Sequence, residues 1–176
     1  GDPEAWRNTN WTQQEESPLE IADFASKPIA EIAAFLRAWQ PREEPRRQTI
    51  TALAQKLRTA ATQDPVKYAQ GAMQFANLPA IYVHRLLDGL SDAARNQLDF
   101  PWASILELLD RTFARLNEPI APDSVAEGDD PTRHWACAAG GALLKTGLRR
   151  GAAGIGFGHK AAVQDLVLTL QRHAPQ

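Results

Sequence analysis

The chain has 176 residues, a formal net charge of −2 and 44% hydrophobic residues. This length can bury a core as one domain, and the composition excludes intrinsic disorder. No apolar run approaches the roughly 18–20 residues that a membrane span needs. The single cysteine, Cys137, excludes an internal disulfide and a multi-cysteine metal site, so we expect a reducing, cytoplasmic compartment.

The first part of the chain predicts a lead-in segment followed by three helices. Residues 1–16 carry two tryptophans and several acids without a helical period, and the chain opens without methionine, so we expect a piece of a longer protein. The segment 17–24 opens on the sequence Ser-Pro-Leu-Glu, which has capping-box spacing and predicts a short helix. Apolar residues at three- and four-residue spacing predict helices over 29–40 and 50–61.

The middle of the chain contains three amphipathic helix patterns, each opened by a proline. The first, 65–76, has a narrow stripe of mostly small residues, from Val66 to Ala76. The second, 79–90, is expected to end at its Asp-Gly pair, and a separate turn or two of helix should follow over 92–98. The third pattern is the most regular. Its apolar face consists of Trp102, Ile105, Leu106, Leu109, Phe113 and Leu116.

The last part of the chain predicts a linker and a C-terminal helical hairpin. Residues 117–130 have prolines, acids and no period, so we expect a loop. The hairpin, 131–176, contains a glycine-rich stretch at 151–158 between its two helices. The inward face of its first helix is predicted to be Trp135, Ala138, Ala139, Ala142 and Leu143. The second helix is marked by Val163, Leu166, Val167 and Leu170.

These patterns predict an all-α fold, because no useful run alternates between apolar and polar residues. Short connections in the middle of the chain predict that successive helices lie antiparallel. The fold we expect is an irregular α-solenoid of HEAT-like hairpins, with residues 17–116 as its helical-repeat core, and a compact helical bundle is the alternative. The prolines that precede apolar-periodic segments are Pro3, Pro18, Pro28, Pro65, Pro79, Pro101 and Pro131.

A resemblance rests on several packing residues spread over most of the chain. They are Trp39-Gln40-Pro41, the run from Leu78-Pro79 through Tyr82 to Leu86-Leu87-Asp88-Gly89-Leu90, Trp102, and Trp135 leading to Gly147-Leu148. Together they resemble divergent HEAT- or armadillo-like helical-repeat regions inside large bacterial multidomain proteins. The resemblance implies a scaffold or sensor segment attached to other domains, and it carries over no catalytic residue.

Candidate chemistry from single residues is sparse. His134 and Cys137 are three residues apart and would share a helix face, where a thiolate and an imidazolium could pair. We interpret Cys137 instead as a small core residue of an alanine-rich helix. The four histidines lack metal-ligand spacing, so we expect no zinc site, no cofactor and no catalytic residue.

The basic C-terminal end offers a tentative anion-binding site. A glycine-rich loop before a helix can present N–H groups to a phosphate, and the candidate residues are Arg149, Arg150, Gly156, Gly158, His159 and Lys160. The string fits neither a Walker loop nor a Rossmann turn. Charge is unevenly distributed, since residues 1–31 hold seven acids and two bases while residues 131–176 hold six bases and one acid.

The sequence therefore predicts a non-catalytic scaffold or sensor module that mediates protein–protein or interdomain interaction within a larger protein. Its expected partners are proteins or adjoining domains of the same chain, without membrane insertion. The alternative is an anion- or nucleic-acid-binding module that uses the basic C-terminal end.

Overall fold

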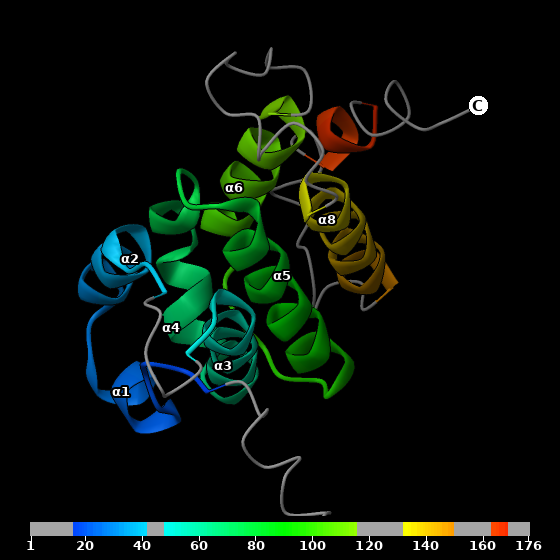
Figure 1. Cartoon of the computed structure of the whole chain (residues 1–176). Coiled ribbons are helices and arrows are strands. Elements are labelled where there is room, and N and C mark those ends of the chain that lie inside the picture. Colours follow the sequence, from blue (N-terminus) through cyan, green and yellow to red (C-terminus); the bar gives the residue numbers. More distant parts are fainter. Residues whose placement is uncertain (1–15, 42–47, 116–131, 150–162, 169–176) are drawn as a thin grey trace, which may run out of the picture.

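The computed structural model describes residues 16–41, 48–115, 132–149 and 163–168, and the regular secondary structure of these residues is helical (Figure 1). In chain order the helices are α1 (Ile21–Ser26), α2 (Ile29–Ala38), α3 (Ile50–Gln63), α4 (Pro65–Gln70), the 3-10 helix η2 (Ala72–Phe75), α5 (Ala80–Arg95), α6 (Ala103–Ala114) and α8 (Thr132–Arg149). Residues 163–168 are also helical. The expected all-α class is confirmed, since the β-type pairing within these residues is one isolated bridge between Glu16 and Gln48.

Three helices match the predicted periods closely. Ile32 and Leu36 of α2 and Leu53 and Leu57 of α3 are buried, as their spacing predicts. In α6 the predicted apolar face is buried from Trp102 to Phe113, while Leu116 lies outside the described residues. None of the described helices has the length and apolar character needed to cross a bilayer.

Helix α5 is the centre of the fold (Figure 1). It packs most extensively against α8 on one side and α3 on another, while α6 contacts η2, α4 and α8. The most closely packed pairs are therefore not consecutive in the chain, although short connections predicted pairing of successive helices. The buried residues of α5 are Ala80, Tyr82, Val83, Leu86, Leu87, Gly89, Leu90, Ser91, Ala93 and Ala94.

The predicted end of this helix at its Asp-Gly pair is wrong, because α5 continues unbroken to Arg95. Gly89 lies at the point where α3 packs across α5. A Cβ atom there would stand 2.4 Å from the Arg58 carbonyl oxygen and 2.9 Å from the Ala61 Cβ. Glycine permits this close approach of two helices and does not stop the helix. Predicting a separate segment over 92–98 was wrong for the same reason.

The predicted helix over 65–76 is divided at Gly71 into α4 and η2. A Cβ atom on Gly71 would lie 2.7 Å from Ile29 Cγ2, so α2 presses against the chain at this point. The predicted stripe is only partly correct. Val66 is 42% exposed, while the large side chains of Tyr68 and Phe75 fill the interior.

The short helix α1 is capped differently from the prediction. The Ser17 hydroxyl accepts a hydrogen bond from Leu19 N (3.3 Å) within a local turn. The helix begins three residues later, after Glu20, whose N–H donates to the Asp23 carboxylate (2.9 Å). The capping pattern is therefore displaced by three residues, because a second acid stands at the spacing that a capping box requires.

A lysine from α4 satisfies the other end of α1. Lys67 Nζ donates to the carbonyl oxygens of Phe24 (2.7 Å), Ala25 (3.2 Å) and Lys27 (2.7 Å). The Tyr68 hydroxyl also donates to the Phe24 oxygen, at 3.1 Å. A six-residue helix is too short to be stable alone, so these bonds to its free carbonyl groups tie α1 to α4.

Candidate functional site

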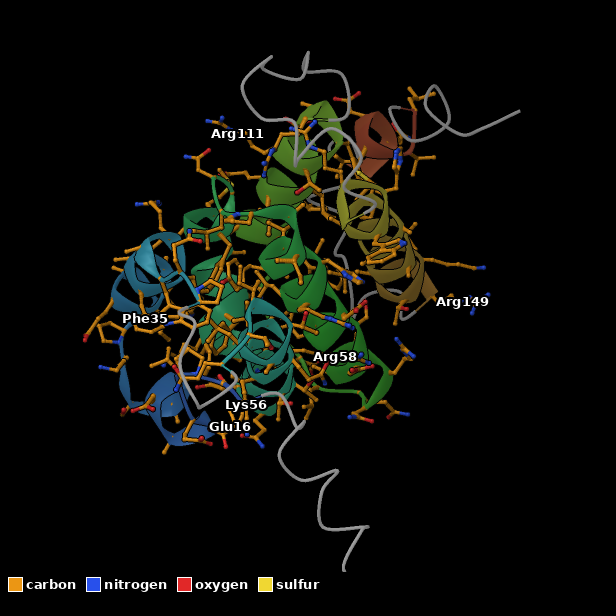
Figure 2. The ribbon with its side chains drawn as sticks, viewed as in Figure 1. Glu16, Phe35, Lys56, Arg58, Arg111 and Arg149 are labelled. Atoms are coloured by element: carbon orange, nitrogen blue, oxygen red, sulfur yellow. The ribbon has the colours of Figure 1, made fainter. Side chains whose placement is uncertain are left out.

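The tentative anion-binding residues lie mostly outside the described part of the chain. Of the six, only Arg149 is described, as the last residue of α8, and its side chain is exposed. Figure 2 shows it at the far end of α8, on the opposite side of the molecule from α1. A cation in the last turn suits the negative end of the helix dipole, which gives Arg149 a structural role without any ligand.

The second sequence candidate, the His134 and Cys137 pair, does not form a reactive thiolate site. His134 is exposed, whereas Cys137 is buried, and its thiol donates to the Thr112 carbonyl oxygen at 3.8 Å. Burial raises the pKa of the Cys137 thiol to about 11, against a smaller opposing effect of the Arg115 charge. The interpretation of Cys137 as a core residue is confirmed.

Helix α8 turns a different face inward from the predicted one. Ala139 and Leu143 are buried as expected, but Ala138 and Ala142 are exposed and Trp135 is 51% exposed. The buried face consists of Ala136, Cys137, Ala139, Gly140, Leu143, Leu144 and Gly147.

The tight contact of α8 with α6 fits this orientation. A Cβ atom on Gly140 would lie 2.7 Å from Leu109 Cδ2 and 3.1 Å from Phe113 Cε1. Small residues fit such a contact and an indole ring does not. The tryptophan is therefore placed at the edge of the α5 contact, with one side toward solvent.

An open hollow lies along the junction of α5 and α8. Its volume is about 510 Å³, and its lining residues are His84 and Asp88 of α5 and Trp135, Ala138, Ala139 and Ala142 of α8. We call it the α5–α8 groove. His84 lies beside Trp135. Figure 1 shows the two helices running in the same direction.

The aromatic end of the groove is built by one residue from each helix. The His84 and Trp135 rings have centroids 5.9 Å apart and planes inclined by 48°. His84 Nε2 also lies 3.1 Å from Asp88 Oδ2, one helical turn farther along α5. The imidazole is thus held on two sides, and it supports the indole ring at the mouth of the groove.

The carboxylate of Asp88 is the anionic group of the groove. Arg85 Nη1 lies 3.4 Å from its Oδ2 atom. Burial raises the pKa of Asp88, but the hydrogen bond from His84 and the charges of His84, Arg58 and Arg85 outweigh burial, so its pKa is below the ordinary value. Asp88 is therefore ionised near neutral pH, with its charge balanced by its own neighbours.

A second acid extends this charged network toward α3. Asp92 Oδ2 lies 2.9 Å from Arg58 Nη2, and Asp92 Oδ1 lies 3.4 Å from Arg95 Nη2. The Arg58–Asp92 pair links α3 to α5, whereas the Arg95–Asp92 pair lies within α5. Their role is structural, since each acid already has a basic partner.

The groove suits the binding of an apolar side chain better than catalysis. Its lining combines an indole face, three alanines and one balanced carboxylate. Within the described ranges, no group of three His, Cys, Asp or Glu side chains is arranged to hold a metal ion. The arrangement offers an aromatic contact next to a shallow apolar surface.

Sequence reasoning missed this groove because it placed Trp135 in the core. A signal was nevertheless present, since the residues 136, 139, 140, 143 and 147 form an alternative helical stripe of small and aliphatic residues. A tryptophan outside that stripe is exposed on one side.

Comparison with protein-family models, curated proteins and solved structures finds no match to this chain. A function can therefore be inferred only from the residues and geometry described above.

Proposed function

We propose that this chain is a non-catalytic interaction module of a larger protein, and that it binds a protein segment in the α5–α8 groove. The observation that carries the proposal is the exposure of Trp135, which lies beside His84 at the mouth of an open hollow. Exposed tryptophans beside an apolar surface are typical anchors of protein interfaces.

The helix arrangement supports the helical-repeat part of the proposal. In a stack of helical hairpins, equivalent helices of neighbouring hairpins lie side by side and run in the same direction. Helices α5 and α8 pack extensively against each other, and Figure 1 shows them side by side and running in the same direction. An irregular HEAT-like solenoid is thus favoured over a compact bundle, with the groove between two successive hairpins.

The lining of the groove favours protein over nucleic acid as its ligand. Asp88 is ionised within it with its charge balanced by its own neighbours, and the described lining contains no lysine or arginine that could bind a phosphate. Ala138, Ala139 and Ala142 offer apolar contact and no hydrogen-bond donor from their side chains. An apolar side chain of a protein segment gains from contact with these alanines and with the Trp135 ring.

Site-specific photo-crosslinking would test the proposal. A photoreactive phenylalanine derivative is placed at position 135, or at Glu107 on the exposed face of α6 as a matched control, in the protein with its native flanking sequence. We expect position 135 alone to crosslink to one defined peptide segment, which mass spectrometry identifies.

The segment is then synthesised and titrated against the purified 176-residue chain. Trp135→Ala should weaken its binding about 10- to 100-fold, as expected for a central aromatic anchor, in a protein that keeps its helical circular dichroism. Glu107→Ala should leave the affinity unchanged. The proposal would be refuted by equal crosslinking from both positions, or by an affinity that Trp135→Ala leaves unchanged.

A further inference from the structure

The solvent side of α8 carries a continuous stripe that extends from the groove to the end of the helix. The stripe consists of Trp135, Ala138, Ala142, Lys145 and Arg149, all exposed. Their spacing places them within about a quarter of the helix circumference. We call it the α8 stripe. It begins with the aromatic anchor, continues with small side chains and ends with two cations.

The charge of this helix has one sign. Between Thr132 and Arg149 the basic residues are Arg133, Lys145 and Arg149, and the sequence of α8 contains no acid. None of the three makes an ion pair with another residue in the described part of the chain, where the pairs involve α1 to α5. Among the described residues, the cations of the stripe therefore have no anion of their own and can meet an external one.

The spacing along the stripe sets the geometry of a partner. At 1.5 Å per residue, Lys145 lies about 15 Å and Arg149 about 21 Å along the helix from Trp135. Ala138 and Ala142 lie between the tryptophan and the cations, and their small side chains allow a second helix to approach closely. A rod-shaped partner of three to four helical turns would touch the anchor and both cations together.

Helix dipoles favour one direction for this partner. Acidic residues are stabilised in the first turn of a helix, and cations are stabilised in the last turn. Lys145 and Arg149 occupy the C-terminal part of α8. A partner helix that runs antiparallel to α8 places its own first turn, with its acids, opposite these two cations.

We infer that the segment bound in the α5–α8 groove is an amphipathic helix with acidic residues in its first turn and a bulky apolar residue three to four turns later. This inference rests on the proposed function and names the chemistry of its partner. The apolar residue packs against Trp135, and the acids face Lys145 and Arg149.

A nucleic acid is disfavoured by the same stripe. Two cations separated from the aromatic anchor by alanines would neutralise few phosphates, and Asp88 lies next to that anchor. Nucleic-acid binding depends on many such phosphate contacts and weakens steeply as salt rises. Titration with labelled RNA and DNA is therefore the control for this alternative.

Selection from a peptide library would test the inference. Helical peptides long enough to cover the α8 stripe, about 14 residues or more, are displayed with random outward positions. They are selected on the 176-residue chain and counter-selected on Trp135→Ala. We expect the retained peptides to carry acids in the first turn and a large apolar residue about 10–14 positions later, to match the stripe.

Charge reversal on both partners then checks the contact. The double change Lys145→Glu, Arg149→Glu should weaken the best peptide about 10- to 100-fold, and lysines in place of the peptide's acids should restore binding. The matched control reverses two exposed arginines elsewhere, Arg37→Glu on α2 and Arg111→Glu on α6, and should leave the affinity unchanged. If the double variant fails to fold, the change of both residues to glutamine gives a smaller loss in the same direction.

The outcomes separate the inference from the proposed function. Peptides that depend on Trp135 but lack acidic residues would overturn the inference and leave the groove a protein-binding site. Failure to retain any peptide that depends on Trp135 would overturn the proposed function as well. If RNA or DNA binds and the double charge reversal abolishes this binding, the partner is a nucleic acid and not an acidic helix.

Discussion

Replacing Gly89 by alanine should destabilise this protein, although alanine normally stabilises the interior of a helix. The added methyl group would stand 2.4 Å from the Arg58 carbonyl oxygen, which is backbone, and 2.9 Å from the Ala61 Cβ. Neither atom lies at the end of a flexible side chain. Helices α3 and α5 must therefore separate, and the hydrogen bond from the Thr62 hydroxyl to the Gly89 carbonyl oxygen (3.1 Å) would lengthen.

The size of the effect follows from three contributions. Alanine gains about 0.8–1.0 kcal/mol over glycine in a helix interior. Overpacking a close contact costs about 1–3 kcal/mol. Weakening of the Thr62–Gly89 hydrogen bond costs at most about 0.5–1.5 kcal/mol, because the Thr62 hydroxyl also lies 3.0 Å from the Arg58 carbonyl oxygen. Their combination gives a net loss of about 2 kcal/mol in the free energy of unfolding, or about 4–8 °C in the thermal midpoint of a protein of this size.

Thermal and urea unfolding, followed by far-UV circular dichroism, would measure this loss. Ser91→Ala in the same helix is the matched control. The Ser91 hydroxyl is buried, with 2% of the residue exposed, and has no hydrogen-bond partner among the described residues. Its removal should raise the free energy of unfolding by about 1 kcal/mol. An unchanged or raised stability of Gly89→Ala would show that α3 and α5 are not in close contact at this point.

Three further predictions follow from other contacts. Lys67→Met removes a charged donor from the end of α1 and should lower the free energy of unfolding by about 1.5–3 kcal/mol, measured in urea. The folded-state pKa of Asp88 is below its ordinary value of 3.8, so its contribution to stability is present above that pH and is lost as pH falls through the folded-state pKa. Asp88→Asn should therefore be less stable than the parent at pH 7, with a difference that shrinks in acid-unfolding experiments below pH 3.8. Because the pKa of Cys137 is about 11, iodoacetamide should alkylate the native protein slowly at pH 8 and the urea-unfolded chain quickly, and equal rates would contradict its burial.

Local sequence patterns were enough to predict the regular helices. In α2, α3 and α6, aliphatic residues recur at helical spacing, so each helix has one clear apolar face to bury. Thr49 and Asp64 stand at the starts of α3 and α4, where their side chains accept from Ala52 N and Lys67 N. Hydrophobic period and capping are properties of neighbouring residues, so a single sequence reveals them.

The glycines could not be interpreted without the tertiary structure. Gly89 and Gly140 have the local signature of a helix end or a weak helix, yet each marks the closest contact between two helices. Which meaning applies depends on the partner helix that crosses there. The error at Gly89 divided α5, and the tight contact at Gly140 accompanies the rotation of α8 that Trp135 revealed.

The candidate site was missed for a related reason. An alanine-rich helix such as α8 has two overlapping stripes of small residues, and hydrophobicity alone assigns a tryptophan to the interior. The stripe that contains Gly140 faces α5 and α6, and Trp135 lies outside it. The groove also requires α5 and α8 to pack together, although they are not consecutive in the chain. Local periodicity does not predict which helices form such a pair.

The construction of the groove from two separated helices links its occupancy to folding. Its walls come from α5 and α8, with α6 and residues 116–131 between them in the chain, so the groove exists only when α8 is docked. A ligand that binds only the docked state stabilises that state. At a ligand concentration 100 times the dissociation constant, the stabilisation is about 2.7 kcal/mol. Hydrogen exchange of the α8 amides should accordingly slow when the groove is filled, which makes this helix a reporter of whether its partner is present.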